Sequence, residues 1–121
     1  MMLDWNGYHT QILQTVGELA KESPDTVRGY RVLSEAGTKT NHLEAKTREL
    51  IALAVAVTVR CDGCIVIHTD AALKQGASRA EITEALGVAV TVNAGAALVY
   101  STRVLDAVKA KSETGTSSQP A

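Results

Sequence analysis

The chain has 121 residues, the length of one domain, since a second independent hydrophobic core would need a longer sequence. Hydrophobic residues make up 45% and charged residues 21% of it, a balance that excludes disorder along the whole chain. The formal net charge is −1, so the basic excess typical of nucleic-acid-binding proteins is missing and we expect no nucleic-acid partner.

The apolar residues are mostly small, with no Phe and a single Trp. Each Ala or Val buries little area, and a short chain of this composition gains further burial by self-association. The N-terminus has no basic segment followed by an apolar one, so no secretory signal is recognised. We take residues 50–59 as the longest uncharged apolar run, and it is far shorter than the roughly 20 residues of a spanning helix. We therefore expect a cytoplasmic protein without a membrane partner.

Two amphipathic helices are predicted in the first third of the chain. The first covers residues 3–20, where apolar side chains recur every three or four positions. The second begins with Ser23 as N-cap and Pro24 at the first helical position. Gly37 is expected to end it, and residues 38–41 would form a polar connection.

The segment from residue 43 to 59 is compatible with two types of secondary structure, a helix and a strand. Residues 44–50 favour a helix, whereas residues 54–59 carry β-branched side chains at alternate positions and would also suit a buried strand. Because nothing breaks the chain before Arg60, we predict one long helix. The next helix should follow directly and run to about Gln75.

The last third predicts two more helices and a tail. Residues 78–81, Ser-Arg-Ala-Glu, form a capping box that opens a helix. Residues 93–95, Asn-Ala-Gly, are expected to kink or break it before a final helix that runs to about Lys109. Residues 112–121 are polar and are predicted to be a disordered tail. Residues 1–111 would thus form a single all-α domain, a bundle of about five to six helices.

The most informative segment is the motif Cys61-x-x-Cys64-x-x-x-His68. On a helix, Cys64 and His68 lie about 300° and about 340° from Cys61, so all three side chains share one narrow face. The two cysteines are close enough for a disulfide across one turn. A helix N-terminus and a neighbouring imidazole both favour the reactive thiolate, and a second thiol can resolve the oxidised first one. The motif therefore indicates redox chemistry.

Glu49 is the candidate partner of His68. If the two helices that flank the motif pack as an antiparallel pair, Glu49 points back toward His68. Measured along the helix axes from the turn between the helices, Glu49 lies about 18 Å away and His68 about 10 Å away, a difference of several Å. We therefore expect Glu49 to reach His68 through a water molecule rather than by direct contact.

Zinc binding is the main chemical alternative for this motif. Cys61, Cys64 and His68 would need a fourth ligand, from Glu49 or His42, and three ligands from two turns of one helix make a closed tetrahedral site awkward. A purely structural pair of buried thiols is the other alternative. Attachment of haem would require His directly after the second cysteine, where Ile65 stands.

The spacing from Glu49 through Cys61 and Cys64 to His68 resembles the alkylhydroperoxidase D-like branch of the carboxymuconolactone decarboxylase family. Residues 45–50 before the motif and 76–82 after it also resemble that branch, and the resemblance extends over about residues 33–108. It implies an all-α bundle with the Cys-x-x-Cys at the N-terminus of a central helix. It also implies assembly as a homotrimer or homohexamer.

The resemblance further implies a thiol-dependent peroxidase that acts on a small hydroperoxide. Cys61 and Cys64 would cycle between dithiol and disulfide, with Glu49 and His68 as the proton relay, and a dithiol or protein reductant would complete the cycle. No cofactor and no metal are expected. One position departs from the branch, which often has His before the second cysteine where this chain has Gly63.

Two other functions remain open on the sequence. The first is a lyase reaction of the decarboxylase type on a small lactone acid, although the decarboxylase branch lacks the cysteine pair. The second is an oligomeric redox sensor without turnover.

Overall fold

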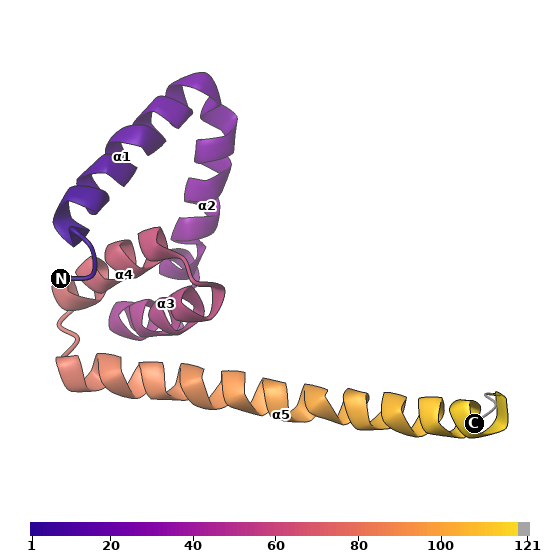
Figure 1. Cartoon of the computed structure of the whole chain (residues 1–121). Coiled ribbons are helices and arrows are strands. Elements are labelled where there is room, and N and C mark those ends of the chain that lie inside the picture. Colours follow the sequence, from indigo (N-terminus) through magenta and orange to yellow (C-terminus); the bar gives the residue numbers. More distant parts are fainter. Residues whose placement is uncertain (119–121) are drawn as a thin grey trace.

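The computed structural model describes residues 1–118, and within them all regular secondary structure is helical (Figure 1). The helices are α1 (Trp5–Glu22), α2 (Pro24–Thr40), α3 (Ala45–Val59), α4 (Asp62–Lys74) and α5 (Arg79–Ser118). The all-α prediction and the placement of the Cys-x-x-Cys at the start of a helix are confirmed. Helix α3 lies at the centre, in contact with both α4 and α5, while α1 packs on α2 and α4.

Helices α1 and α2 form a hairpin whose closed end points away from the other helices (Figure 1). Asp4 caps α1 by accepting a hydrogen bond from the backbone N–H of Gly7 at 3.2 Å. Ser23 is the N-cap residue of α2, as predicted, but its hydroxyl bonds to the Thr26 hydroxyl at 2.6 Å instead of capping a backbone N–H.

The predicted end of α2 at Gly37 is wrong, because the helix continues to Thr40 and ends at Asn41 in the left-handed conformation, with φ of 49°. Asn tolerates this conformation better than most residues. Gly37 serves a packing contact instead. A Cβ at this position would lie only 2.8 Å from Cδ of Arg48, so glycine lets the Arg48 side chain cross α2.

The ambiguous segment forms a helix, as predicted, and supplies the centre of the core. Leu53, Ala72 and Ala77 are buried together, with Leu50 and Ile82 packed against them. The cluster joins α3 to α4 and to the start of α5. It is small, since alanine makes up two of its three buried residues.

Helix α5 is continuous, so the break or kink predicted at residues 93–95 is wrong. The Asn93 amide donates to the backbone oxygen of Ala89 at 2.8 Å and to the Thr58 hydroxyl at 2.9 Å. These bonds hold Asn93 within the helix and attach it to α3. The capping box is confirmed at the other end, where Ser78 N–H donates to the Glu81 carboxylate at 2.9 Å and Glu81 N–H donates to the Ser78 hydroxyl at 3.0 Å.

The predicted C-terminal tail, residues 112–121, overlaps this helix, which runs to Ser118; residues 119–121 lie outside the described residues. Helix α5 also contains a longer uncharged apolar segment than the sequence analysis considered for a membrane-spanning helix. Residues 85–102 carry no charged side chain, so residues 50–59 are not the longest uncharged run. By length and composition alone, the segment Arg79–Glu113, whose most apolar 18-residue window has a mean hydropathy of 1.6, is long and apolar enough to cross a membrane.

Candidate functional site

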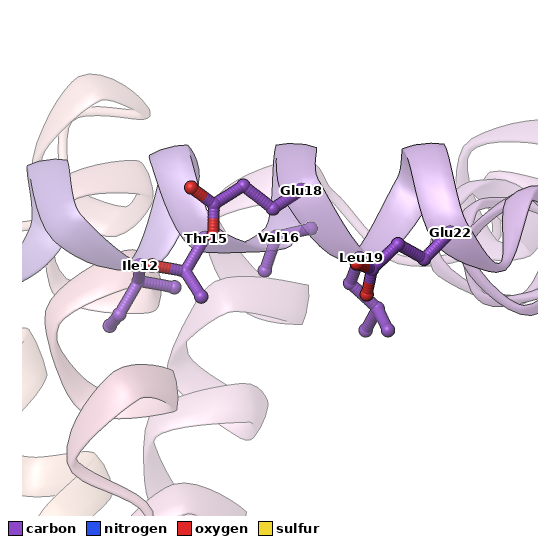
Figure 2. Close-up of a pocket in the computed structure, with 6 residues that line it drawn as sticks. All are labelled: Ile12, Thr15, Val16, Glu18, Leu19 and Glu22. Atoms are coloured by element: carbon purple, nitrogen blue, oxygen red, sulfur yellow. The ribbon is translucent and has the colours of Figure 1, made fainter.

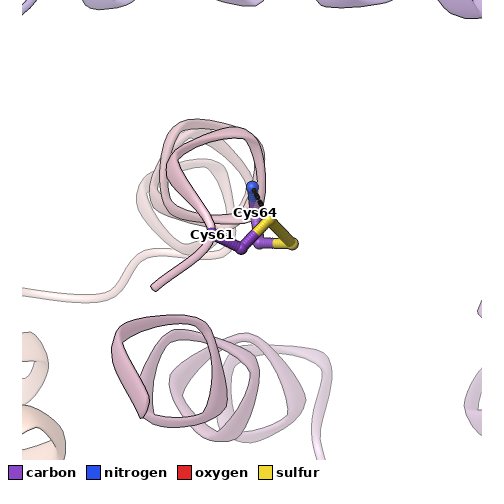
Figure 3. The surroundings of a disulfide bond; sticks show 2 residues. All are labelled: Cys61 and Cys64. Atoms are coloured by element: carbon purple, nitrogen blue, oxygen red, sulfur yellow. Dashed lines mark hydrogen bonds between the residues drawn. A yellow bond between two sulfur atoms is a disulfide. The ribbon is translucent and has the colours of Figure 1, made fainter. Parts of the chain in front are cut away.

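The cysteine motif begins where the chain reverses between α3 and α4. Arg60 ends α3 in the left-handed conformation, with φ of 56°, and Cys61 follows as the N-cap of α4. The backbone N–H of Cys64 donates to Cys61 Sγ at 3.1 Å, the dashed line in Figure 3. The Cys61 sulfur thus takes the position of a helix-capping acceptor, where a backbone N–H and the helix dipole favour negative charge.

Cys61 and Cys64 form a disulfide across the first turn of α4, with their Cα atoms 5.2 Å apart (Figure 3). Both residues are half-buried. The sequence prediction that the pair can close a disulfide across one turn agrees with this geometry. The structure therefore describes the chain with this disulfide formed.

Glu49 and His68 are in direct contact, with Nδ1 of His68 2.7 Å from Oε2 of Glu49. The expectation of a water between them is wrong. The expectation compared only the positions of the two residues along straight helix axes. The side chains of Glu49 and His68 span the remaining difference of several Å. Their side chains are 24% and 30% exposed, so the pair is partly shielded from water.

The contact defines the arrangement of the imidazole ring. With Nδ1 engaged by the carboxylate, Nε2 is the nitrogen that remains to accept or donate another proton. His68 lies one helical turn beyond Cys64, on the same face of α4. Glu49 and His68 thus meet between α3 and α4, and Cys64 and Cys61 precede His68 by about one and two turns. No hydrogen bond joins His68 to either sulfur within residues 1–118, so proton transfer between them requires a bridging water or substrate atom.

Gly63, the position that departs from the resemblance, lies under α1. A Cβ there would be 3.2 Å from Cδ1 of Ile12 and 4.0 Å from the Tyr8 hydroxyl. Glycine therefore allows the apolar stripe of α1 to approach the first turn of α4, between the cysteines. Sequence reasoning predicted an amphipathic helix over residues 3–20 but missed its approach to Gly63, because that approach depends on the relative position of two helices.

A second feature that the sequence did not predict is a cavity of about 450 Å³ between α1 and α4. Its polar rim includes Asn6, His9, Thr69 and Asp70. A hydrogen bond from Lys74 lowers the pKa of Asp70 and keeps it charged. The cavity is lined by residues of α4 that lie on a different side from Cys64 and His68.

The zinc alternative requires the same side chains as the redox motif. Across the part of the chain that the structure describes, no three His, Cys, Asp or Glu side chains form a group that could hold a metal ion. In the oxidised form both cysteine sulfurs are bonded to each other, so neither is a thiolate ligand.

The chain is similar to the members of a known protein family. Residues 24–107 match the model of the carboxymuconolactone decarboxylase family. An uncharacterized protein from Haemophilus influenzae is 49% identical over 107 residues, covering 88% of this chain and 95% of its own. A second uncharacterized protein, from Cupriavidus necator, is 32% identical, covering 79% of this chain and 85% of its own.

Two solved structures resemble the fold. A carboxymuconolactone decarboxylase family protein from Legionella pneumophila, crystallised in its apo form, is 36% identical with a TM-score of 0.70, covering 87% of this chain and 94% of its own. A protein from Methanobacterium thermoautotrophicum is 30% identical with a TM-score of 0.65, covering 71% of this chain and 97% of its own.

Proposed function

The chain belongs to the carboxymuconolactone decarboxylase family, and from this premise we propose that it is a thiol-dependent peroxidase of the alkylhydroperoxidase D-like branch. The single observation that carries the proposal is the disulfide at the start of α4 together with the Glu49–His68 contact one turn further along. A redox-active thiol pair needs a way to lose and regain protons, and this contact supplies a charged partner for the imidazole.

The reaction begins from the dithiol form. His68 accepts the proton of one cysteine, and the thiolate attacks the terminal oxygen of a hydroperoxide, R–O–OH. The O–O bond breaks, the cysteine becomes a sulfenic acid, and the leaving alkoxide takes a proton to become an alcohol. The second cysteine then attacks the sulfenic sulfur, forms the disulfide and releases water. In sum, two thiols and R–O–OH give one disulfide, R–OH and water.

A dithiol or protein reductant completes the cycle by thiol–disulfide exchange. One cysteine forms a mixed disulfide with the donor, the second donor thiol resolves it, and the dithiol is restored. The half-buried position of both sulfurs allows such a donor to approach. These steps use only side chains of this chain and the two co-substrates, and we propose that they take place in the cytoplasm.

The two cysteines have different surroundings, and the test of the proposed function replaces each of them in turn. Cys61 Sγ accepts the Cys64 backbone N–H, and Cys64 lies nearer His68 in the helix. We expect Cys61→Ser and Cys64→Ser each to reduce steady-state consumption of an alkyl hydroperoxide by at least about a hundredfold, because attack and resolution need one thiol each. Peroxide is followed colorimetrically with dithiothreitol as electron donor.

Thr69→Ser is the matched control, since it changes the same helix away from the sulfurs and should retain turnover. Full activity in either cysteine variant would reject the two-cysteine cycle. Activity toward a lactone acid that survives alkylation of both thiols would support the lyase reaction instead.

A further inference from the structure

The cavity between α1 and α4 has the size and the mixed lining of a small-molecule site, and we call it the α1–α4 cavity. Its volume of about 450 Å³ lies within the range of about 300–1,000 Å³ that is usual for ligand pockets. Helix α1 contributes Trp5 and His9, one turn apart. Helix α4 contributes a stripe that contains Val66, Asp70 and Leu73. Val66 is buried and Leu73 is 57% exposed, so the stripe extends from the interior to the surface.

The α1–α4 cavity is separate from the redox motif. Relative to Cys64, His68 lies about 40° around the axis of α4, whereas Val66 and Leu73 lie about 200° and about 180° around it. The cavity residues of α4 thus occupy the opposite side of the helix from the Cys64 sulfur and the His68 imidazole. A molecule held in the cavity would not meet the cysteines, so this is not the place where the proposed peroxide reacts.

A hollow of similar size along α1 is a weaker candidate for a bound molecule (Figure 2). Its volume is about 460 Å³, but its lining residues all belong to α1, between Ile12 and Glu22. A single helix supplies one wall, whereas a small-molecule site buries most of the surface of its ligand. The α1–α4 cavity has walls from two helices and can enclose a ligand between them.

Asp70 gives the α1–α4 cavity its charge. Lys74 lies 2.9 Å from Oδ2 of Asp70, and the hydrogen bond between them is the main cause that lowers the pKa of Asp70. The Lys74 side chain is 75% exposed and points away from the cavity lining. Within residues 1–118, no Lys or Arg lines the cavity, so a cationic ligand would meet the carboxylate without a lysine or arginine inside the cavity.

Trp5 adds a second group that favours a cation. The face of an indole ring attracts an ammonium group more strongly than other aromatic side chains do, and it also offers apolar surface to the body of a ligand. Trp5 and Asp70 come from different helices, so a cation bound between them would contact both α1 and α4. The Asp70 carboxylate would repel an anion, and a purely apolar molecule would displace water from it without replacing the lost hydrogen bonds.

We propose that the α1–α4 cavity binds a small organic ammonium ion with an aromatic or branched aliphatic body. The ammonium group donates to Asp70 and lies against the face of Trp5, while the body packs on Val66 and Leu73. The ligand is bound and released unchanged. The inference goes beyond the proposed peroxidase function and does not depend on it, and its tests measure binding and not turnover.

The first test uses the single Trp of the chain, whose emission reports on this cavity because Trp5 lines it. The full chain is titrated with phenethylammonium well below the pKa of about 10 of an alkylamine, with excitation selective for Trp. Emission should change saturably. Phenethylammonium should bind at least about tenfold more tightly than phenethyl alcohol or hydrocinnamate, which carry the same phenyl body with a neutral or an anionic group.

The second test changes the charge of the cavity in both directions. Asp70→Asn keeps the shape of the side chain and should abolish the preference for the ammonium ion, while the affinity for phenethyl alcohol stays unchanged. Lys74→Gln should raise the ammonium affinity about threefold, because it removes the cation that competes for the Asp70 carboxylate. Asp25→Asn is the matched control, since it also removes a carboxylate that is paired within its own helix, with Arg28 on α2, and it should change neither affinity.

Four results would each overturn the proposal. The first is the absence of a saturable change in Trp5 emission, and the second is equal affinity for the three phenyl compounds, which would make the cavity a general apolar site. The third is a preference for the ammonium ion that survives in Asp70→Asn, and the fourth is a Lys74→Gln chain that binds it no more tightly. Circular dichroism identifies any variant that does not fold. Because the two substitutions act in opposite directions, either one alone still tests the proposal.

Discussion

The contact between Glu49 and His68 is the residue-scale feature on which the proposed chemistry depends. The Glu49 carboxylate lies 2.7 Å from Nδ1 of His68. Glu49 belongs to α3, the helix that comes before the cysteines in the chain. Such a carboxylate fixes the orientation of the imidazole ring and leaves Nε2 available for proton transfer. The residue acts through His68 and not on the sulfur, so Glu49 is a positioning residue.

Glu49→Gln keeps the shape of the side chain but removes its charge. In the reduced protein, His68 should then accept the thiol proton less readily, and the pH midpoint of iodoacetamide labelling should rise toward the value of about 8.5 of a free thiol. His68→Asn should give a similar shift, and the double variant should add little, because both residues act on one proton. Labelling rates are measured against pH in all four proteins.

The rate should recover at high pH, where hydroxide ionises the thiol without the relay. An unchanged labelling midpoint in Glu49→Gln, with peroxidase activity retained, would make Glu49 a structural residue and contradict the relay.

The ion pair between Lys46 and Glu81, 2.8 Å apart, gives a pH prediction for stability. The hydrogen bond from Lys46 is the main cause that lowers the pKa of Glu81, helped by the Ser78 backbone N–H. The carboxylate form is thus favoured in the folded state. Its contribution is present above the unfolded pKa of about 4.3 and is lost as the pH falls through the lower folded value.

Glu81→Gln should therefore lower the thermal unfolding midpoint at pH 7, and the difference from the original chain should shrink below about pH 4. Glu84→Gln, one turn later on the same helix and exposed, should change the midpoint little at either pH. A deficit of Glu81→Gln that persists unchanged at acidic pH would show that the charge of Glu81 contributes nothing.

At the scale of elements, Gly63 determines how closely α1 lies on α4. A Cβ would meet Ile12 at 3.2 Å, and a branched side chain would force α1 outward. Gly63→Val should lower the free energy of unfolding by about 1–3 kcal/mol, the usual cost of overpacking. Gly17→Val is the matched control on α1, where a Cβ meets nothing within 4 Å. Urea unfolding at one fixed protein concentration measures both, and equal stabilities for the two variants would contradict the packing role of Gly63.

The sequence predicted the helices best where local chemistry decides their ends. The capping box at Ser78 and the start of α2 at Pro24 are short-range features, and both lie where they were predicted. The predictions at Gly37 and at residues 93–95 failed because tertiary contacts outweigh local preference. Arg48 packs over Gly37, and Thr58 of α3 holds Asn93 within α5.

The candidate site shows the same contrast between local features, which the sequence predicts, and tertiary contacts, which it does not. The shared face of Cys61, Cys64 and His68 follows from helical periodicity. The direct contact of Glu49 with His68 depends on the packing of α3 against α4, which axial distances alone did not resolve. The approach of Ile12 to Gly63 had no sequence signal, because it joins helices that are distant in the chain.

At the scale of the whole molecule, the buried core is small, and large apolar side chains are exposed on every one of the five described helices. The buried cluster joins α3, α4 and the start of α5. The exposed apolar residues of α1 and of the C-terminal half of α5 lie outside it.

Intact-protein mass spectrometry of the reduced chain tests the central claim most directly. The full chain is reduced, freed of reductant and treated with one equivalent of cumene hydroperoxide. We predict that the mass falls by two hydrogen atoms per chain, that both thiols disappear together, and that dithiothreitol restores them. Retention of both thiols, or stepwise gain of oxygen on one cysteine without loss of the other thiol, would contradict a peroxide-driven dithiol–disulfide cycle at Cys61 and Cys64.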